Sequence, residues 1–329
     1  MKKPIILCFA LIAWTVVVYN YWRFLPADED CLRAMALYEE MQRNINKPLI
    51  GEEYTPMTTT LGSLEAKKSS LDPIAAALIV KLLKEAQVTA GMPVAINGSG
   101  SFPGFILAGL CACSALRLNA FVIASAGSSS YGANVKGATI ADILLDKAVS
   151  AATDSGGAYR LLALTPGGSE DRGAGLDAAE LKRLAAVLAQ NNIPFFRPRN
   201  ITEAINFRTA LFEENNCGLL INIGGNHAAA GDETQMGLLY GLIKPDDAKK
   251  YNGDGLMQRY LFSGKQVIQL LNTKKLYAAY KLRFDKEGAL ISGDARLLRY
   301  RKPGRLFVLA PPACLLLLAA LRRKMKRSG

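Results

Sequence analysis

The sequence predicts an α/β protein with a doubly wound, mostly parallel sheet and an apolar segment at each end of the chain. Short apolar runs of strand length alternate with longer segments of helical pattern from about residue 72 onward. Several of the runs end in loops rich in glycine, serine and asparagine, as expected for strand-to-helix turns. At 329 residues, half of them hydrophobic, the chain can bury one large core or two smaller ones.

The predicted elements follow in a regular order. A helix over residues 28–44, which can serve as a stalk, precedes an irregular Thr-rich stretch at residues 54–70. Asp72 and Pro73 begin a helix that stops near Gly91. The alternation that follows predicts a Rossmann-like sheet, with strands at 94–96, 121–124, 161–164, 194–196 and 219–223 and helices at 103–118, 139–151, 178–190, 202–214 and after 231.

The net charge of +12 is concentrated at the two ends of the chain. All 28 acidic residues lie within residues 28–294, whereas thirteen of the 40 basic residues lie outside that range. Basic residues beside apolar termini indicate membrane topology and not a nucleic-acid-binding surface, so no nucleic-acid partner is expected. The single histidine and the scattered six cysteines argue against a zinc site, and neither a metal nor a cofactor is expected.

Both terminal apolar segments predict contact with a membrane. The run at residues 5–22 ends in aromatic residues, which favours a retained anchor over the alternative of a cleaved signal peptide. A second run at 306–321 precedes a basic cluster. We expect an anchor at 1–25, an extracytoplasmic domain of one or two lobes at 26–303, and a transmembrane helix with a basic cytoplasmic tail at 304–329. Basic residues between 296 and 305 run against this orientation.

A glycine- and serine-rich turn after the first predicted strand is the centre of the predicted site. The turn, Gly98-Ser-Gly-Ser-Phe-Pro-Gly104, departs from a dinucleotide fingerprint because Pro103 stands where the third glycine or alanine belongs. Pro103 suits the first position of a helix, and the free amides of that helix start suit a carboxylate or phosphate. A tight turn without a ligand is the other interpretation.

Three similar loops follow later strands and are expected to meet the first one. The carboxyl ends of parallel strands lie at one edge of a sheet, so their loops can converge on a polar or anionic ligand. Glycine and serine are also common in turns that bind nothing. The predicted ligand-binding residues are Ser99, Gly100, Ser101, Ser128, Ser129, Asn134, Gly168, Gly225, Asn226 and His227.

A serine hydrolase is an alternative to simple binding. His227 is the only histidine and would be the general base, with Ser99, Ser101 or one of Ser128–Ser130 as nucleophile and Asp171 or Asp232 orienting the imidazole. No serine lies in a Gly-x-Ser-x-Gly elbow, so the catalytic residues stay open.

Two groups of charged residues have less specific interpretations. Glu65, Lys67 and Lys68 either fold over the site or remain free on the surface. Asp142 and Asp146 lie four residues apart in a predicted helix and are interpreted as a solvated face, with a metal or acid-pair role as the alternative.

Six short segments, in a consistent order, resemble a known family. They are Thr60-Leu-Gly-Ser-Leu-Glu-Ala-Lys67, Gly98-Ser-Gly-Ser-Phe-Pro-Gly104, Ser129-Ser-Tyr-Gly-Ala-Asn134, Ile223-Gly-Gly-Asn-His227, Gly253-Asp-Gly255 and Leu270-Leu-Asn-Thr273. Together they resemble the poly-gamma-glutamate system protein family, whose members accompany the machinery that makes and exports this polymer. The resemblance implies a bacterial cytoplasmic membrane location, with the polymer and other components of the synthesis and export system as partners. It brings no known catalytic residues.

Three functions therefore remain open from the sequence. The leading hypothesis is a membrane-anchored accessory protein of capsule or released-polymer production that binds the anionic polymer at the strand-end loops. The second is a hydrolase or transpeptidase that acts on the γ-amide with a loop serine and His227. The third is a module that binds a small anion.

Overall fold

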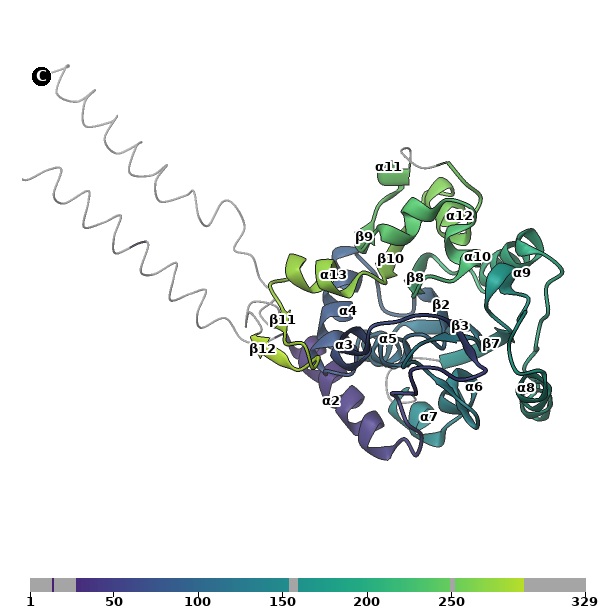
Figure 1. Cartoon of the computed structure of the whole chain (residues 1–329). Coiled ribbons are helices and arrows are strands. Elements are labelled where there is room, and N and C mark those ends of the chain that lie inside the picture. Colours follow the sequence, from purple (N-terminus) through teal and green to yellow (C-terminus); the bar gives the residue numbers. More distant parts are fainter. Residues whose placement is uncertain (1–13, 15–27, 154–158, 249–251, 293–329) are drawn as a thin grey trace, which may run out of the picture. The chain divides into compact units, whose positions relative to one another are not determined.

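A six-stranded, mostly parallel sheet forms the centre of the protein (Figure 1). The computed structural model describes residues 14, 28–153, 159–248 and 252–292. The strand order is β7-β3-β2-β8-β10-β9, and within it β9 alone is antiparallel to its neighbour. The predicted α/β fold is thus confirmed for the strands β2 (Pro93–Ser99), β3 (Asn119–Ser125), β7 (Tyr159–Thr165), β8 (Leu219–Ile223), β9 (Gly241–Ile243) and β10 (Gln266–Leu270).

The direction in which the chain adds strands reverses between β2 and β8. From β2 the chain builds outward through β3 to β7, and it then returns to the other side of β2 to add β8 and later β10. In open parallel sheets this reversal leaves a crevice above the carboxyl ends of the two central strands, because their connections leave in opposite directions.

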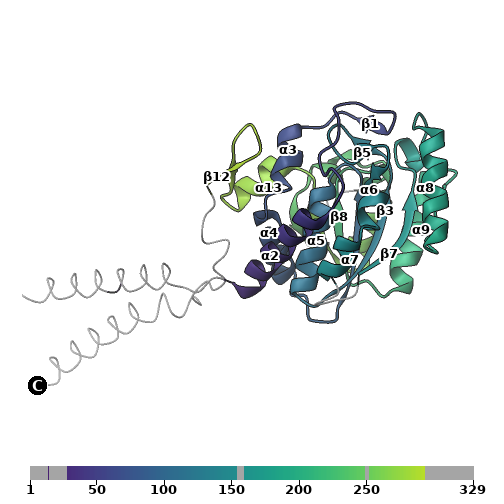
Figure 2. The ribbon, with the colours of Figure 1, turned by 90° about the horizontal axis from the view of Figure 1, so that it is seen from below.

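Helices cover both faces of the sheet (Figures 1 and 2). Neighbouring residues of β2 show the two faces: Ile96 lies against Gly109 of one helix layer, whereas Asn97 accepts a hydrogen bond from Arg208 of the other. The first layer contains α2 (Glu29–Asn44), α4 (Ile74–Glu85), α5 (Pro103–Ala115) and α7 (Lys147–Thr153), and the second contains α9 (Ile201–Glu214), α10 (His227–Ala230) and α12 (Leu256–Phe262).

The helix α5 is the buried centre of the first layer. Pro103 occupies its first turn as predicted, and every residue from Pro103 to Ala115 is buried. A helix that is apolar on all sides must be buried on all sides, and α5 is enclosed by the sheet, α4 and α2.

The predicted stalk at residues 28–44 is wrong, because α2 packs on α4 and α5. Tyr38 and Met41 of α2 are buried. The Tyr38 hydroxyl lies 3.0 Å from the carbonyl oxygen of Ser70 and 2.9 Å from that of Gly104. These contacts make α2 an integral part of the first helix layer.

Three other predicted elements differ from the structure. The strand predicted at 194–196 is reduced to an isolated bridge between Leu164 and Phe195. The helix predicted at 139–151 is divided into α6 (Ile140–Leu144) and α7. The helix predicted after residue 231 begins earlier, as α10 at His227, and is followed by a short 3-10 helix, η2 (Thr234–Leu238).

The predicted solvated face of Asp142 and Asp146 is also wrong, because α6 ends between them. Asp142 instead caps α6 by accepting from the backbone N–H of Thr139 at 2.9 Å. Its carboxylate also receives both terminal nitrogens of Arg183, at 2.9 and 2.7 Å, and this bidentate pair lowers the pKa of Asp142. Burial raises that pKa as the largest single effect, and the hydrogen bonds outweigh it. Because Arg183 belongs to the helix α8 (Ala178–Gln190), Asp142 fastens α6 to α8.

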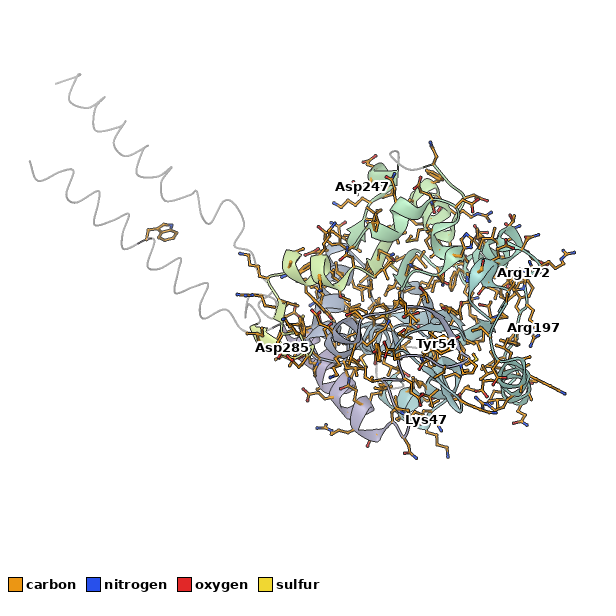
Figure 3. All side chains as sticks on the ribbon, viewed as in Figure 1. Lys47, Tyr54, Arg172, Arg197, Asp247 and Asp285 are labelled. Atoms are coloured by element: carbon orange, nitrogen blue, oxygen red, sulfur yellow. The ribbon has the colours of Figure 1, made fainter. Side chains whose placement is uncertain are left out.

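The remaining elements, all short apart from α8, lie around the sheet. They are β1 (Thr58–Thr60), α3 (Leu64–Ser69), β4 (Ser128–Ser129), β5 (Asn134–Val135), β6 (Ala138–Thr139), η1 (Ser169–Asp171), α8 (Ala178–Gln190), α11 (Pro245–Ala248), α13 (Thr273–Ala279), β11 (Arg283–Phe284) and β12 (Leu290–Ser292). The exposed side chains of Arg172, Arg197 and Asp247 project outward from this shell (Figure 3).

The predicted membrane segments, 1–25 and 304–329, lie outside the described residues apart from residue 14. Across the ranges that the structure describes, no helix combines the length and the apolar character that a bilayer crossing requires.

Candidate functional site

A cleft of about 820 Å³ opens at the carboxyl ends of β2 and β8, where the order of strands reverses. Its volume lies in the range of small-molecule sites. The loops after β2, β3, β7 and β8 all contribute to its walls, together with the segments around β1, α3 and the start of α13. The predicted ligand-binding residues that line it are Ser99, Ser101, Ser129, Gly168, Gly225, Asn226 and His227.

The other three predicted ligand-binding residues, Gly100, Ser128 and Asn134, shape the loops instead. The Asn134 amide donates to the Glu52 carbonyl at 2.8 Å and accepts from the Glu52 N–H at 3.0 Å. These two bonds hold the segment around Glu52 against the loop that follows β3. The Ser128 hydroxyl donates to the Ser129 carbonyl at 2.8 Å. An added Cβ at Gly100 would lie 3.1 Å from the Ala126 carbonyl oxygen, so the backbone approaches closely there.

Lys67 and Ser129 form a buried polar pair in one wall of the cleft. The Lys67 ammonium nitrogen, Nζ, lies 2.7 Å from Ser129 Oγ, and the two residues are 2% and 5% exposed. Among the described residues no carboxylate forms an ion pair with Lys67. Lys67 Nζ also lies 3.6 Å from the centre of the Phe102 ring.

Burial lowers the pKa of Lys67 to about 7, because the ammonium loses water and gains no opposite charge. The Phe102 ring favours the ammonium form and limits this effect. Near neutral pH the side chain is therefore divided between the ammonium and the free amine. The free amine is a base within hydrogen-bonding distance of a serine hydroxyl, which is the arrangement that activates a serine for nucleophilic attack.

The position of this pair depends on a short parallel pairing between β1 and β4. Thr58 lies opposite Ser128, and Thr60 lies opposite Ser129. The chain then passes Gly62 and enters α3, whose first turn is capped by Ser63 Oγ accepting from the Ala66 N–H. At Gly62 an added Cβ would lie 2.9 Å from Ser129 Oγ, so this backbone packs directly against the hydroxyl.

His227 lies at the mouth of the cleft, and its hydrogen bonding argues against the predicted role of general base. Its Nδ1 accepts from the Glu170 N–H at 3.3 Å, so in the neutral imidazole the proton is on Nε2. Nε2 then lacks the lone pair that would take a serine proton. The nearest carboxylate to Nε2 is that of Asp232, at 3.6 Å, and the Asp232 side chain is 93% exposed.

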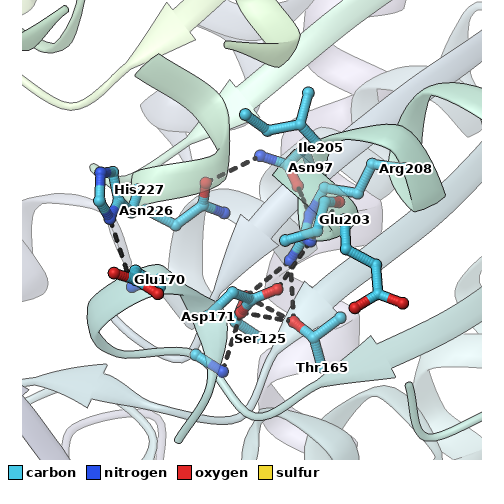
Figure 4. A network of polar contacts seen from close by, with 12 residues as sticks. Asn97, Ser125, Thr165, Glu170, Asp171, Glu203, Ile205, Arg208, Asn226 and His227 are labelled. Atoms are coloured by element: carbon cyan, nitrogen blue, oxygen red, sulfur yellow. Dashed lines mark hydrogen bonds and ion pairs between the residues drawn. The ribbon is translucent and has the colours of Figure 1, made fainter. Parts of the chain in front are cut away.

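Asp171, predicted to orient His227, instead forms an ion pair with Arg208 (Figure 4). Its Oδ2 lies 2.7 Å from Arg208 Nη1 in a fully buried ion pair. Its Oδ1 accepts from the Thr165 hydroxyl at 2.8 Å and the Gly167 N–H at 2.9 Å. The carboxylate thus fixes the loop after β7, in which Glu170 and Asp171 both have positive φ.

The Arg208–Asp171 pair belongs to a row of buried polar side chains that crosses the sheet below the cleft, which we call the polar row. It contains Asn97, Ser125, Thr165, Asn222 and Gln269, one from each of the five parallel strands, with Arg208 of α9 above them. Asn97 donates to Asn222 and Asn222 donates to Gln269, each at 2.6 Å, while Arg208 donates to Asn97 at 3.0 Å and Thr165 at 2.8 Å. Of the polar row, Ser125 lines the cleft, and the loops after β2, β3, β7 and β8 that form the cleft walls continue from strands that carry the row.

The predicted Ser101 lies beside Ser129, and among the described residues no basic side chain is hydrogen-bonded to its hydroxyl. Its Oγ accepts from the Ser129 backbone N–H at 2.9 Å. From the sequence, Lys67 is expected near the site without a role of its own, because Lys67 and Lys68 are adjacent and alike. The signal that separates them is helical spacing, since α3 turns Lys67 inward and leaves Lys68 exposed.

Within the described ranges, no three histidine, cysteine or acidic residues converge to hold a metal ion. In comparisons with known proteins, no family model, curated protein or solved structure matches the chain.

Proposed function

We propose that the protein is a serine acyl-transfer enzyme, a hydrolase or transpeptidase, with Ser129 as nucleophile and Lys67 as general base. The observation that carries the proposal is the 2.7 Å contact between a buried lysine with a pKa near 7 and a serine hydroxyl at the wall of a cleft. Lys67 takes the place of His227 in the hydrolase hypothesis drawn from the sequence.

The chemistry follows from the two protonation states of Lys67. The free amine accepts the Ser129 hydroxyl proton while Oγ bonds to the acyl carbon and the carbonyl electron pair moves to oxygen. As the carbonyl re-forms, the Lys67 ammonium returns that proton to the departing amine. Water or a second amine then attacks the acyl-enzyme, giving hydrolysis or transpeptidation.

The substrate class is supported by the charges of the cleft. Its ionisable lining residues are Lys67, His227 and Lys274, and among the described residues no acidic side chain lines it. No acidic side chain of the lining itself repels a carboxylate-bearing amide, while Lys274 is paired with Glu65, beside the cleft, at 3.3 Å. The resemblance to the poly-gamma-glutamate system family makes the γ-amide of a glutamate chain the first substrate to test, in a membrane-anchored protein of that system.

The direct test is covalent labelling of the full chain with a fluorophosphonate, followed by peptide mapping. We expect one label, on Ser129. If no label forms while calorimetry detects glutamate oligomers with an affinity that grows with length and falls with salt, the accessory polymer-binding hypothesis replaces the enzyme. Binding of single small anions without dependence on chain length would favour the small-anion module.

The labelling rate is expected to rise with pH through a midpoint near 7 and to level off above it. Only the free amine of Lys67 accepts the Ser129 proton, and burial lowers the pKa of that amine to about 7. Measuring the pseudo-first-order rate from about pH 5 to about pH 9.5 gives the midpoint. A rate that does not depend on pH over this range would exclude Lys67 as the base.

Gly62→Ala is expected to slow labelling by about tenfold or more. The new methyl group would lie 2.9 Å from both Ser129 Oγ and the Ser130 carbonyl oxygen, so the segment leading to Lys67 must move away from β4. Gly109→Ala in α5 is the matched control, because its methyl group meets neighbours only at 3.8 Å or more. Equal rates for the two variants would contradict the close packing of Gly62 on the nucleophile.

A further inference from the structure

The backbone amides that usually serve a serine nucleophile are already in use around Ser129. Acyl-transfer enzymes stabilise the oxyanion with hydrogen-bond donors, commonly the N–H of the nucleophile or of the residue after it. Here the Ser129 N–H donates to Ser101 Oγ at 2.9 Å, and the Ser130 N–H donates to the Thr60 carbonyl at 3.0 Å. A donor for the oxyanion must come from elsewhere.

The Ser101 hydroxyl is free to supply that donor. Its oxygen accepts the Ser129 N–H, and in the part of the chain that the structure describes its own proton has no acceptor. Ser101 lines the cleft and is partly exposed to it. A hydroxyl that accepts one hydrogen bond becomes a stronger donor in the next, because the bonds polarise one another.

We infer that the Ser101 hydroxyl is the oxyanion donor of this site, a role that rests on the proposed acyl transfer. When Ser129 Oγ bonds to the acyl carbon and its proton passes to Lys67, the carbonyl electron pair moves to oxygen. That oxygen accepts a hydrogen bond from Ser101, and the bond is lost again when the carbonyl re-forms. Ser101 keeps its proton throughout.

The turn between β2 and α5 holds Ser101 in place for this role. Its N–H lies 3.4 Å from Ser99 Oγ, and the preceding Gly100 is fixed on both sides, by its N–H to Ser125 at 2.9 Å and by its carbonyl to Ala133 at 2.7 Å. The next residue, Phe102, lies against Lys67 Nζ. One rigid turn thus supports both the general base and the oxyanion donor.

The test compares Ser101→Ala with Ser101→Thr in the full chain, with p-nitrophenyl acetate as the acylating probe. Ser101→Ala is expected to lower the acylation rate constant by about ten- to a hundredfold with KM changed less than about twofold. This fall in rate is smaller than for an enzyme left without any oxyanion donor. Ser101→Ala also frees the Ser129 N–H from its bond to Ser101, and that N–H can then donate to the oxyanion in part. Ser101→Thr keeps the hydroxyl and is expected to restore the rate to within about threefold. Ser263→Ala, at the C-cap that follows α12, is the control for replacing a serine outside the cleft.

The pH profile separates this role from a structural one. In Ser101→Ala the midpoint near pH 7 should stay in place, because Lys67 and Ser129 remain paired. A shifted midpoint, or a rate equal to that of the wild type, would overturn the inference. If the wild-type protein itself is not acylated at Ser129, it is the proposed function that fails.

Discussion

Lys67→Met is expected to remove nearly all acyl transfer and, at the same time, to make the folded protein more stable below about pH 7. The activity is expected to fall by about a thousandfold or more, since loss of one member of a nucleophile–base pair removes most of the benefit of both. The methionine fills a similar buried volume and requires no desolvation of a charge. Fluorophosphonate labelling measures the first effect and urea unfolding the second.

The direction of the stability effect follows from the pKa of Lys67 in the two states. Burial lowers it to about 7 in the folded protein, from the ordinary 10.5 of the unfolded chain. Between these values the unfolded chain binds a proton that the folded chain lacks, so the unfolding free energy of the wild type rises with pH over that window. Below about pH 7 the buried ammonium destabilises the folded state in full, and Lys67→Met should gain more at pH 6 than at pH 9.

Lys68→Met is the matched control, because it makes the same change one residue along on the exposed side of α3. It should keep the labelling rate, and its effect on stability should be the same at both pH values. If Lys68→Met loses as much activity as Lys67→Met, the assignment of the general base to Lys67, the buried lysine of the two, is contradicted.

Arg208→Met is expected to lower the unfolding free energy by about 3–5 kcal/mol. The substitution removes the ion-pair partner of Asp171, whose side chain is 4% exposed, and an unpaired buried charge is strongly destabilising. It also removes donors to Asn97 and Thr165 in the polar row. Denaturant unfolding followed by circular dichroism gives the change in free energy.

Arg259→Met serves as the comparison, since the side chain of its partner Asp254, at 2.6 Å, is 69% exposed to solvent, so that losing this pair should lower the unfolding free energy by about 1 kcal/mol or less. The double variant Arg208→Met with Asp171→Leu should recover part of the lost stability, because no charge is left unpaired. Equal losses for Arg208→Met and Arg259→Met would show that burial does not strengthen the Arg208 pair.

The sequence predicted the parallel sheet well because its central strands are short, apolar and separated by clear turn residues. Strands β2, β3, β7 and β8 all appear where expected. Strand β10 is not apparent in the sequence, because Gln266 and Gln269 interrupt its apolar run. The buried Gln269 side chain accepts a hydrogen bond from Asn222. Propensity cannot foresee a partner that lies far away in the chain.

The position of the cleft was predictable, and its chemistry was not. The strand-end loops around Ser99, Ser129 and Asn226 converge as parallel strands require. His227 and Asp171 are residue types common in catalytic sites, but His227 is hydrogen-bonded to the Glu170 N–H and Asp171 is paired with Arg208. The role of Lys67 depends on burial and on a contact across 62 positions of the chain, and neither is visible in local pattern.

The polar row also restricts how the strands can align during folding. Parallel apolar strands present similar surfaces to one another, so hydrophobic burial alone permits several offsets between neighbours. Asn97 lies opposite Asn222, and Asn222 lies opposite Gln269, only in the native alignment. A shift of one residue in β8 would turn the Asn222 amide toward the apolar layer of α5. A buried amide without a hydrogen-bond partner lowers the stability of the fold by about 1–3 kcal/mol. The amides beneath the cleft thus select one strand alignment from several that burial would accept.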